Sequence, residues 1–143
     1  MNKFTLLFSL SCLLIFIACK SNKYTPTELS ETRIHFGNGG GFVGAQNAYI
    51  LLENGQLYQH DIRQDTMQAL ESVRRKTCKT LFKALETVEV DKLGANQPGN
   101  RYFFVEYITP DQQFKTTWGA SGFRVDSTLK ATYFQLMEQV EKE

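Results

Sequence analysis

Alternation of polar and apolar residues marks several strands in the first half of this chain. Residues 32–36 alternate as a half-buried strand does. Residues 46–53 have an apolar centre, and residues 56–62 follow them as a return strand after Asn54-Gly55. Asn-Gly favours a tight type I′ hairpin turn, which needs positive φ at both central residues. Residues 65–73 fit either a strand or an irregular segment.

Helical periodicity takes over in the next segment and returns at the end of the chain. Residues 74–88 repeat apolar positions every three or four residues, whereas residues 91–100 contain the glycines and the proline of a loop. Two aromatic strands are expected at 101–109 and 114–118. Asp126 is positioned to cap a closing helix. The apolar positions of the two helices are Cys78, Leu81, Phe82, Leu85 and Val88, then Leu129, Tyr133, Leu136 and Val140.

This order of elements predicts the α+β class. Hairpins favour antiparallel pairing, and two helices can cover one face of the sheet that the hairpins form. We therefore expect a single antiparallel sheet of about four to five strands with two helices packed on one face. Residues 32–143 would make up this one domain.

The start of the chain has the pattern of a bacterial lipoprotein signal. A short basic start precedes an apolar run at 4–17, and Ala18-Cys19 is followed by polar residues. Ile17-Ala18-Cys19 resembles the site at which the cysteine is lipidated and becomes the new N-terminus, although Phe16 replaces the usual leucine. The pattern predicts a signal peptide at 1–18, acyl chains such as palmitate on Cys19, and a polar tether at 19–31.

Other interpretations of this leader are weaker. The apolar run is shorter than the roughly 20 residues that a membrane-spanning helix needs. A secretory signal without lipidation is the next alternative, and Cys12 follows too short an apolar run to be the lipid site. We expect the protein in the cell envelope, anchored to a membrane by lipid and facing the periplasm or the cell surface.

The composition of the chain limits the kinds of partner that we expect. Sixteen basic residues nearly balance fifteen acidic ones, and no basic patch stands out, so nucleic acid is not an expected partner. If Cys12 is removed and Cys19 is lipidated, Cys78 is the one remaining cysteine of the three, and no internal disulfide can form. Cys78 lies among apolar helix positions, which favours a core thiol over a nucleophile.

The sequence lacks a recognisable catalytic or metal-binding constellation. Its two histidines, His35 and His60, lie on predicted strands and show no metal-ligand spacing. His60 and Asp61 are adjacent, and adjacent strand residues point to opposite faces. We therefore expect no enzyme activity, no catalytic residue, no metal site and no cofactor.

A glycine-rich segment at 37–44 interrupts the strand pattern. It contains a formal G-x-G-x-x-G match, but strand and not helix follows, which disfavours a phosphate or dinucleotide site. A bulge or tight turn is one explanation for these glycines. A recognition loop that presents Phe42 to a partner is the other. The candidate contact residues are Gly39, Gly40, Gly41, Phe42 and Gly44, together with Trp118 at the corner before Gly119.

Gly40-Gly41-Phe42-Val43-Gly44 and the order of elements resemble emfourin-type inhibitors of thermolysin-like metallopeptidases. The likeness would extend over about residues 34–140. The leader makes the chain similar also to small lipoproteins of Bacteroidetes bacteria. The first resemblance implies an α+β fold and protease binding through loops. We expect a non-enzymatic, lipid-anchored protein that binds a protein partner, with protease inhibition as a specific form; the alternative is binding of a small ligand, with a pocket between helix and sheet.

Overall fold

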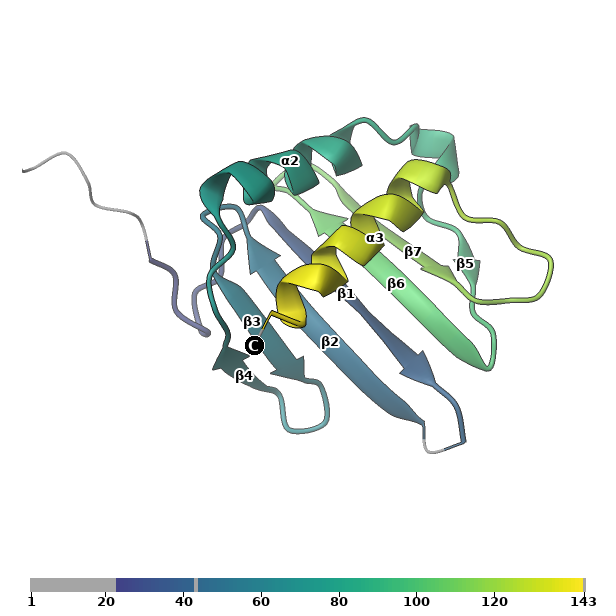
Figure 1. Ribbon diagram of the computed structural model, residues 1–143, viewed down its shortest axis with the longest axis horizontal. Coiled ribbons are helices and arrows are strands. Elements are labelled where there is room, and N and C mark those ends of the chain that lie inside the picture. Colours follow the sequence, from purple (N-terminus) through teal and green to yellow (C-terminus); the bar gives the residue numbers. More distant parts are fainter. Residues whose placement is uncertain (1–22, 43, 143) are drawn as a thin grey trace, which may run out of the picture.

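A computed structural model describes residues 23–42 and 44–142 of the chain (Figure 1). The predicted signal peptide at 1–18, Cys19 and the first part of the predicted tether lie outside the described residues. The strands of the sheet are β1 (Arg33–Gly40), β2 (Ala45–Leu52), β3 (Leu57–Asp61), β4 (Thr66–Ala69), β5 (Asn96–Gln97), β6 (Arg101–Ile108) and β7 (Gln113–Trp118). The helices are α2 (Arg75–Glu86), the short 3-10 helix η2 (Val90–Lys92) and α3 (Ser127–Val140).

The strands form one mixed sheet in the order β4-β3-β2-β1-β6-β7-β5. All neighbouring pairs are antiparallel except β5 and β7, which are parallel. The α+β class is confirmed, but the expected four to five antiparallel strands were too few. The two missed strands are short: β4 lies in the ambiguous segment, and β5 has only two residues inside the predicted loop.

The glycine-rich segment is strand over its first half. β1 continues through Gly37 to Gly40 because β2 pairs with it on one side and β6 on the other. Glycine weakens a strand by its conformational entropy, but two flanking ladders satisfy the backbone groups here. The expected interruption therefore begins only after Gly40.

Both α-helices lie on one face of the sheet (Figure 1). Ile34 and Phe36 of β1 point toward them and are fully buried, as are Leu81 of α2 and Leu136 of α3. The periodic apolar positions predicted for the two helices are in this core, apart from Val140, which is only partly buried. Asp126 caps α3 as predicted, because its Oδ1 accepts from the amides of Thr128 at 2.8 Å and Leu129 at 3.1 Å.

The hairpin between β2 and β3 forms, but with a different turn. Gly55 has φ of 93°, whereas Asn54 is not in the positive-φ region, so the turn is not type I′. The amide of Gly55 donates to the Leu52 carbonyl, and the amide of Leu52 bonds to the Gln56 carbonyl, both at 2.9 Å. This is a longer loop closed by a left-handed glycine, the next most common hairpin solution.

Residues from the predicted tether cover part of the sheet face that lacks helices. Ile50, Leu52 and Tyr58 are buried there beneath Tyr24 and Leu29. The carbonyl of Tyr24 also accepts hydrogen bonds from Gln56 Nε2 at 3.0 Å and from the Tyr58 hydroxyl at 3.1 Å. The segment from Tyr24 onward therefore packs as part of the domain.

Candidate functional site: the β1–β2 hairpin tip

Five of the predicted contact residues lie together where β1 turns into β2. Gly40, Gly41 and Gly44 all have positive φ, at 91°, 79° and 60°. The amide of Gly41 donates to the Asn100 carbonyl at 2.7 Å, and the amide of Gly44 donates to the Gly41 carbonyl at 3.1 Å. The positive φ values and these two hydrogen bonds hold the backbone at Gly41 and at Gly44.

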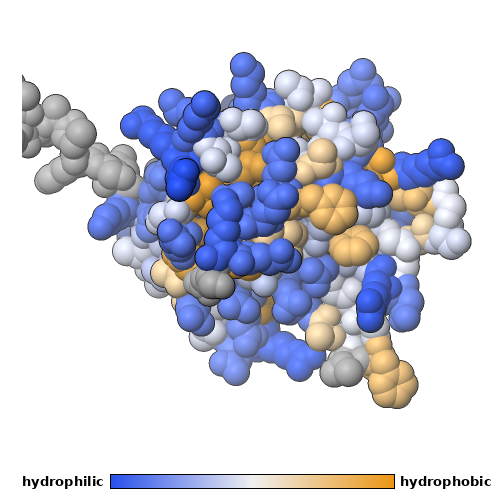
Figure 2. All heavy atoms as spheres, viewed as in Figure 1, coloured by the Kyte–Doolittle hydropathy of each residue, from blue (hydrophilic) through white to orange (hydrophobic). Residues whose placement is uncertain are grey.

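Phe42 lies at the tip of this loop with its side chain fully in solvent, at 107% of the reference exposure. Two other large apolar side chains in the described part of the chain are less exposed. The exposed fraction is 47% for Ile62 and 53% for Phe134. In the space-filling view, apolar atoms project at this tip, at the lower right (Figure 2). A ring so exposed contributes nothing to the folded core, so packing does not explain its presence.

Gly39 belongs to the strand rather than to the tip. A Cβ at Gly39 would lie 2.5 Å from the Tyr102 hydroxyl oxygen, because the Tyr102 ring lies over this position. Its glycine is therefore explained by close approach of a neighbouring side chain. Close packing thus explains why position 39 is a glycine. At Gly41 and Gly44, by contrast, an added Cβ would have no atom within 4 Å.

Trp118, the remaining predicted contact, is not on the surface. Its ring is 7% exposed and packs against Phe103 and Tyr133, with ring centroids at 5.9 Å and 5.2 Å. The side chain points to the helix-covered face, where α3 closes over it. The prediction of Trp118 as a partner contact is therefore wrong: aromatic character in a strand cannot distinguish an exposed ring from a core ring.

The two histidines lie on the sheet face that lacks helices. His35 Nδ1 is 3.4 Å from Glu106 Oε2, and burial lowers the His35 pKa to about 4 despite that carboxylate. His35 is thus neutral at physiological pH. Its Nε2 is buried without a hydrogen-bond partner among the described residues.

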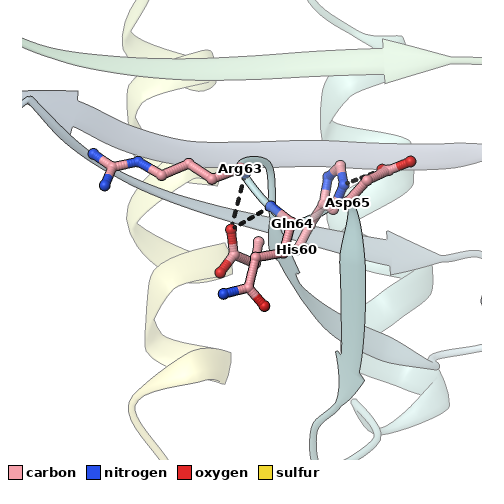
Figure 3. Close-up of polar contacts among 5 residues, drawn as sticks. His60, Arg63, Gln64 and Asp65 are labelled. Carbon is pink, nitrogen blue, oxygen red and sulfur yellow. Dashed lines mark hydrogen bonds and ion pairs between the residues drawn. The ribbon is translucent and has the colours of Figure 1, made fainter.

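His60 does not form a pair with its neighbour Asp61. Its Nε2 is 3.2 Å from Asp65 Oδ1, and Asp65 is 92% exposed (Figure 3). Asp61 instead accepts from the amides of Arg63 at 2.9 Å and Gln64 at 3.1 Å, which closes the turn between β3 and β4. These contacts stabilise a turn and do not bring a base, a nucleophile and an orienting group together.

Cys78 is a core thiol, as expected. It is 1% exposed, its Sγ donates to the Leu52 carbonyl at 3.4 Å, and burial raises its pKa to about 11. A protonated, enclosed thiol is a poor nucleophile.

Within residues 23–42 and 44–142, no three histidine, cysteine or acidic side chains come together as a metal site would require. Over the same residues, no helix has the length and apolar character to cross a membrane.

Among the described residues, two of the hollows bear on ligand binding. One, of about 300 Å³, lies between α2 and the end of the sheet, with Leu85 and Tyr107 among its lining residues, where the small-ligand alternative expects a pocket. The other, of about 510 Å³, lies on the face that lacks helices. The second hollow was not predicted from the sequence; the signal for it is Gly39, which leaves room for the Tyr102 ring that lines the hollow.

Comparison with known proteins adds no relationship. No protein-family model matches the chain, and no curated protein is significantly similar to it in sequence. The resemblances to emfourin-type inhibitors and to Bacteroidetes lipoproteins therefore stay predictions.

Proposed function

We propose that this chain is a non-enzymatic, lipid-anchored protein of the cell envelope that binds a protein partner through the β1–β2 hairpin tip. The observation that carries the proposal is Phe42: a fully exposed aromatic ring on a loop of left-handed glycines. Burying a phenylalanine side chain against a partner contributes about 1.5–3 kcal/mol. Aromatic anchors of this kind often dominate the binding energy of protein interfaces.

The hydrogen bonds at Gly41 and Gly44 support the same function. Backbone that hydrogen bonds already hold in place loses less conformational entropy when it binds. The hydrogen bond from Gly41 to Asn100 ties the loop to the segment before β6, so the tip moves with the sheet. Open space around Gly41 and Gly44 also leaves room for a partner to approach the backbone.

The proposed lipid anchor is compatible with binding of a partner at the hairpin tip. Cys19 precedes Tyr24 by a few residues, which span about 17 Å at most when extended. Tyr24 is hydrogen-bonded to the domain, so a lipid on Cys19 would hold the domain close to the bilayer. The segment that begins at residue 23 and the hairpin tip lie at opposite ends of β1 (Figure 1). The tip would therefore point away from the membrane, toward a partner.

Inhibition of a thermolysin-like metallopeptidase is the specific form that the resemblance suggests. The test measures peptide cleavage by several such enzymes in the presence of the full-length protein, purified in detergent. We expect slowing by the wild type and at least about tenfold weaker inhibition by Phe42→Ala, because an interface anchor is lost. Phe134→Ala removes the exposed phenylalanine of α3 and serves as the matched control.

If none of the enzymes is slowed, the inhibitor form is rejected. The anchor has a separate test, which is the intact mass of the protein isolated from its native host. Lipidation predicts a chain that begins at Cys19 and carries added acyl mass. A chain that retains Met1, or an unmodified Cys19, would overturn the anchor and leave the hairpin tip to be judged on its own.

A further inference from the structure

The sheet face that lacks helices contains a groove that reaches from Gln46 of β2 across β6 and β7 to Asn96 of β5. Side chains alternate between faces along a strand, so Gly37 and Gly39 share this face with His35. Gly37 lies between Ala48 of β2 and Phe104 of β6, and Gly39 lies between Gln46 and Tyr102. Because Gly39 has no side chain, the Tyr102 ring lies over it, and a Cβ at this position would be 2.5 Å from the Tyr102 hydroxyl oxygen.

Residues of β2, β5, β6 and β7 line this groove, which has a volume of about 510 Å³. That volume is within the range of small-molecule sites, roughly 300–1,000 Å³. The walls combine amides, hydroxyls, an ammonium group and aromatic rings. The lining residues are Gln46, Asn96, Pro98, Tyr102, Phe104, Lys115 and Thr117.

Lys115, an exposed residue, is the one charged residue among these lining residues. Lys115 lies directly opposite Glu106 in the ladder between β6 and β7, yet the two do not form an ion pair. Glu106 instead accepts from Gln113 Nε2 at 2.6 Å and approaches His35. Lys115 Nζ lies 5.0 Å from the centre of the Phe104 ring and has no carboxylate partner among the described residues.

We propose that this groove binds a small anionic sugar, a hydroxylated ring that bears a carboxylate or a phosphate. The uncompensated Lys115 would bind the anionic group, since hydrogen bonds between charged partners are the stronger ones. The amides of Gln46 and Asn96 supply both donors and acceptors for ring hydroxyls. The Tyr102 ring offers an apolar surface to the opposite side of the sugar ring. The site is independent of the hairpin tip and of the proposed partner.

The test is isothermal titration calorimetry of the full-length protein in detergent with three sugars. Glucuronate carries a carboxylate, glucose 6-phosphate carries a phosphate, and glucose is the neutral control. We expect at least one of the anionic sugars to bind and glucose to bind about tenfold more weakly or not at all. The anionic sugar that binds identifies which anionic group the groove prefers.

The variant that tests the groove is Lys115→Gln, which should weaken binding of the anionic sugar by about tenfold or more. Lys130→Gln removes an equal charge from exposed α3 on the opposite face and should leave binding unchanged. Thermal melting of each variant checks that the fold is intact. Binding of neither anionic sugar, equal binding of glucose, or equal effects of the two lysine variants would each overturn the proposal.

Discussion

The two hairpins that flank β2 both depend on left-handed glycine, but for different reasons. At the β2–β3 turn, a Cβ on Gly55 would lie 2.5 Å from the Val73 carbonyl oxygen, and the Gly55 carbonyl accepts from the Val73 amide at 2.8 Å. At the β1–β2 tip, Gly41 has a similar φ but no atom within 4 Å of a built Cβ. Packing requires the first glycine, whereas only the backbone angle requires the second.

The difference separates a turn that packs against the domain from a turn that is open to solvent. The β2–β3 turn is enclosed by the chain that leads into α2, so it stabilises the domain. At the β1–β2 tip, the Gly41 amide donates to the Asn100 carbonyl, and the Phe42 side chain lies in water. Substitutions should therefore change stability at one hairpin and binding at the other.

The largest effect is expected for Gly55→Val. The substitution combines left-handed strain of about 1–2 kcal/mol with a clash against backbone that cannot move freely, so we expect a loss of about 3 kcal/mol of unfolding free energy. Urea unfolding followed by fluorescence of Trp118, the single tryptophan, measures it. A loss below about 1 kcal/mol would show that the turn is not held by packing.

Acid should weaken the sheet that the two hairpins share. His35 of β1 has a folded-state pKa of about 4, below its ordinary value of 6.5. Between these pH values the unfolded chain binds a proton that the folded chain does not, so stability falls as the pH is lowered through this window. We expect the free energy of unfolding to fall by about 2 kcal/mol. The fall is smaller than the full pKa difference would give, because part of the His35 ring is still in contact with water.

The control variant for this prediction is His35→Gln. Its free energy of unfolding should lack the part of the pH dependence that comes from His35. The difference in unfolding free energy between wild type and variant, measured from pH 7 to pH 4, isolates His35 from the carboxylates. Parallel curves for the two proteins would contradict the assigned burial of His35. Gly55→Val and Gly41→Val should each keep the wild-type pH dependence, because neither touches His35.

A smaller loss is expected for Gly41→Val. Open space removes the clash, so left-handed strain of about 1–2 kcal/mol is the whole cost. The same urea titration measures it beside Gly55→Val. If the two variants lose equal stability, the distinction between the two hairpins fails.

The smallest change in stability is expected for Phe42→Ala. A side chain in full contact with water supports no packing, so unfolding free energy should stay within about 0.5 kcal/mol of wild type. Phe134→Ala is the control, at a half-exposed position on α3. A clear loss of stability at Phe42 would mean that the ring packs against the domain, contrary to its proposed role in partner binding.

Hydrophobic periodicity was sufficient to predict the fold class and the part of the core beneath the helices. The chemistry of the Asp126 side chain was sufficient to predict the cap of α3. Local sequence could not show β5, because two residues have no period and the parallel pairing with β7 is set by tertiary contacts. Trp118 and Phe42 show the same limit at the site. Both are aromatic residues beside glycine, and only the positions of α3 and the hairpin distinguish the buried ring from the exposed one.

The groove was missed for a related reason. The glycines of β1 were interpreted as a loop, and within a loop their alternation has no meaning. Once β1 is a central strand, Gly39 falls on the face that lacks helices and leaves room for Tyr102, which lines the groove together with Lys115. The hairpin tip itself was predicted because an apolar residue among glycines is unusual enough to be noticed locally.

The most direct test of partner binding at the tip is photo-crosslinking in the native host. Phe42 is replaced by the photoreactive analogue benzoylphenylalanine, which keeps the aromatic ring, and Phe134 is replaced in the same way as a control. The account predicts a discrete crosslinked protein from position 42 that is absent from position 134. No crosslink at position 42, or the same products from both positions, would contradict it.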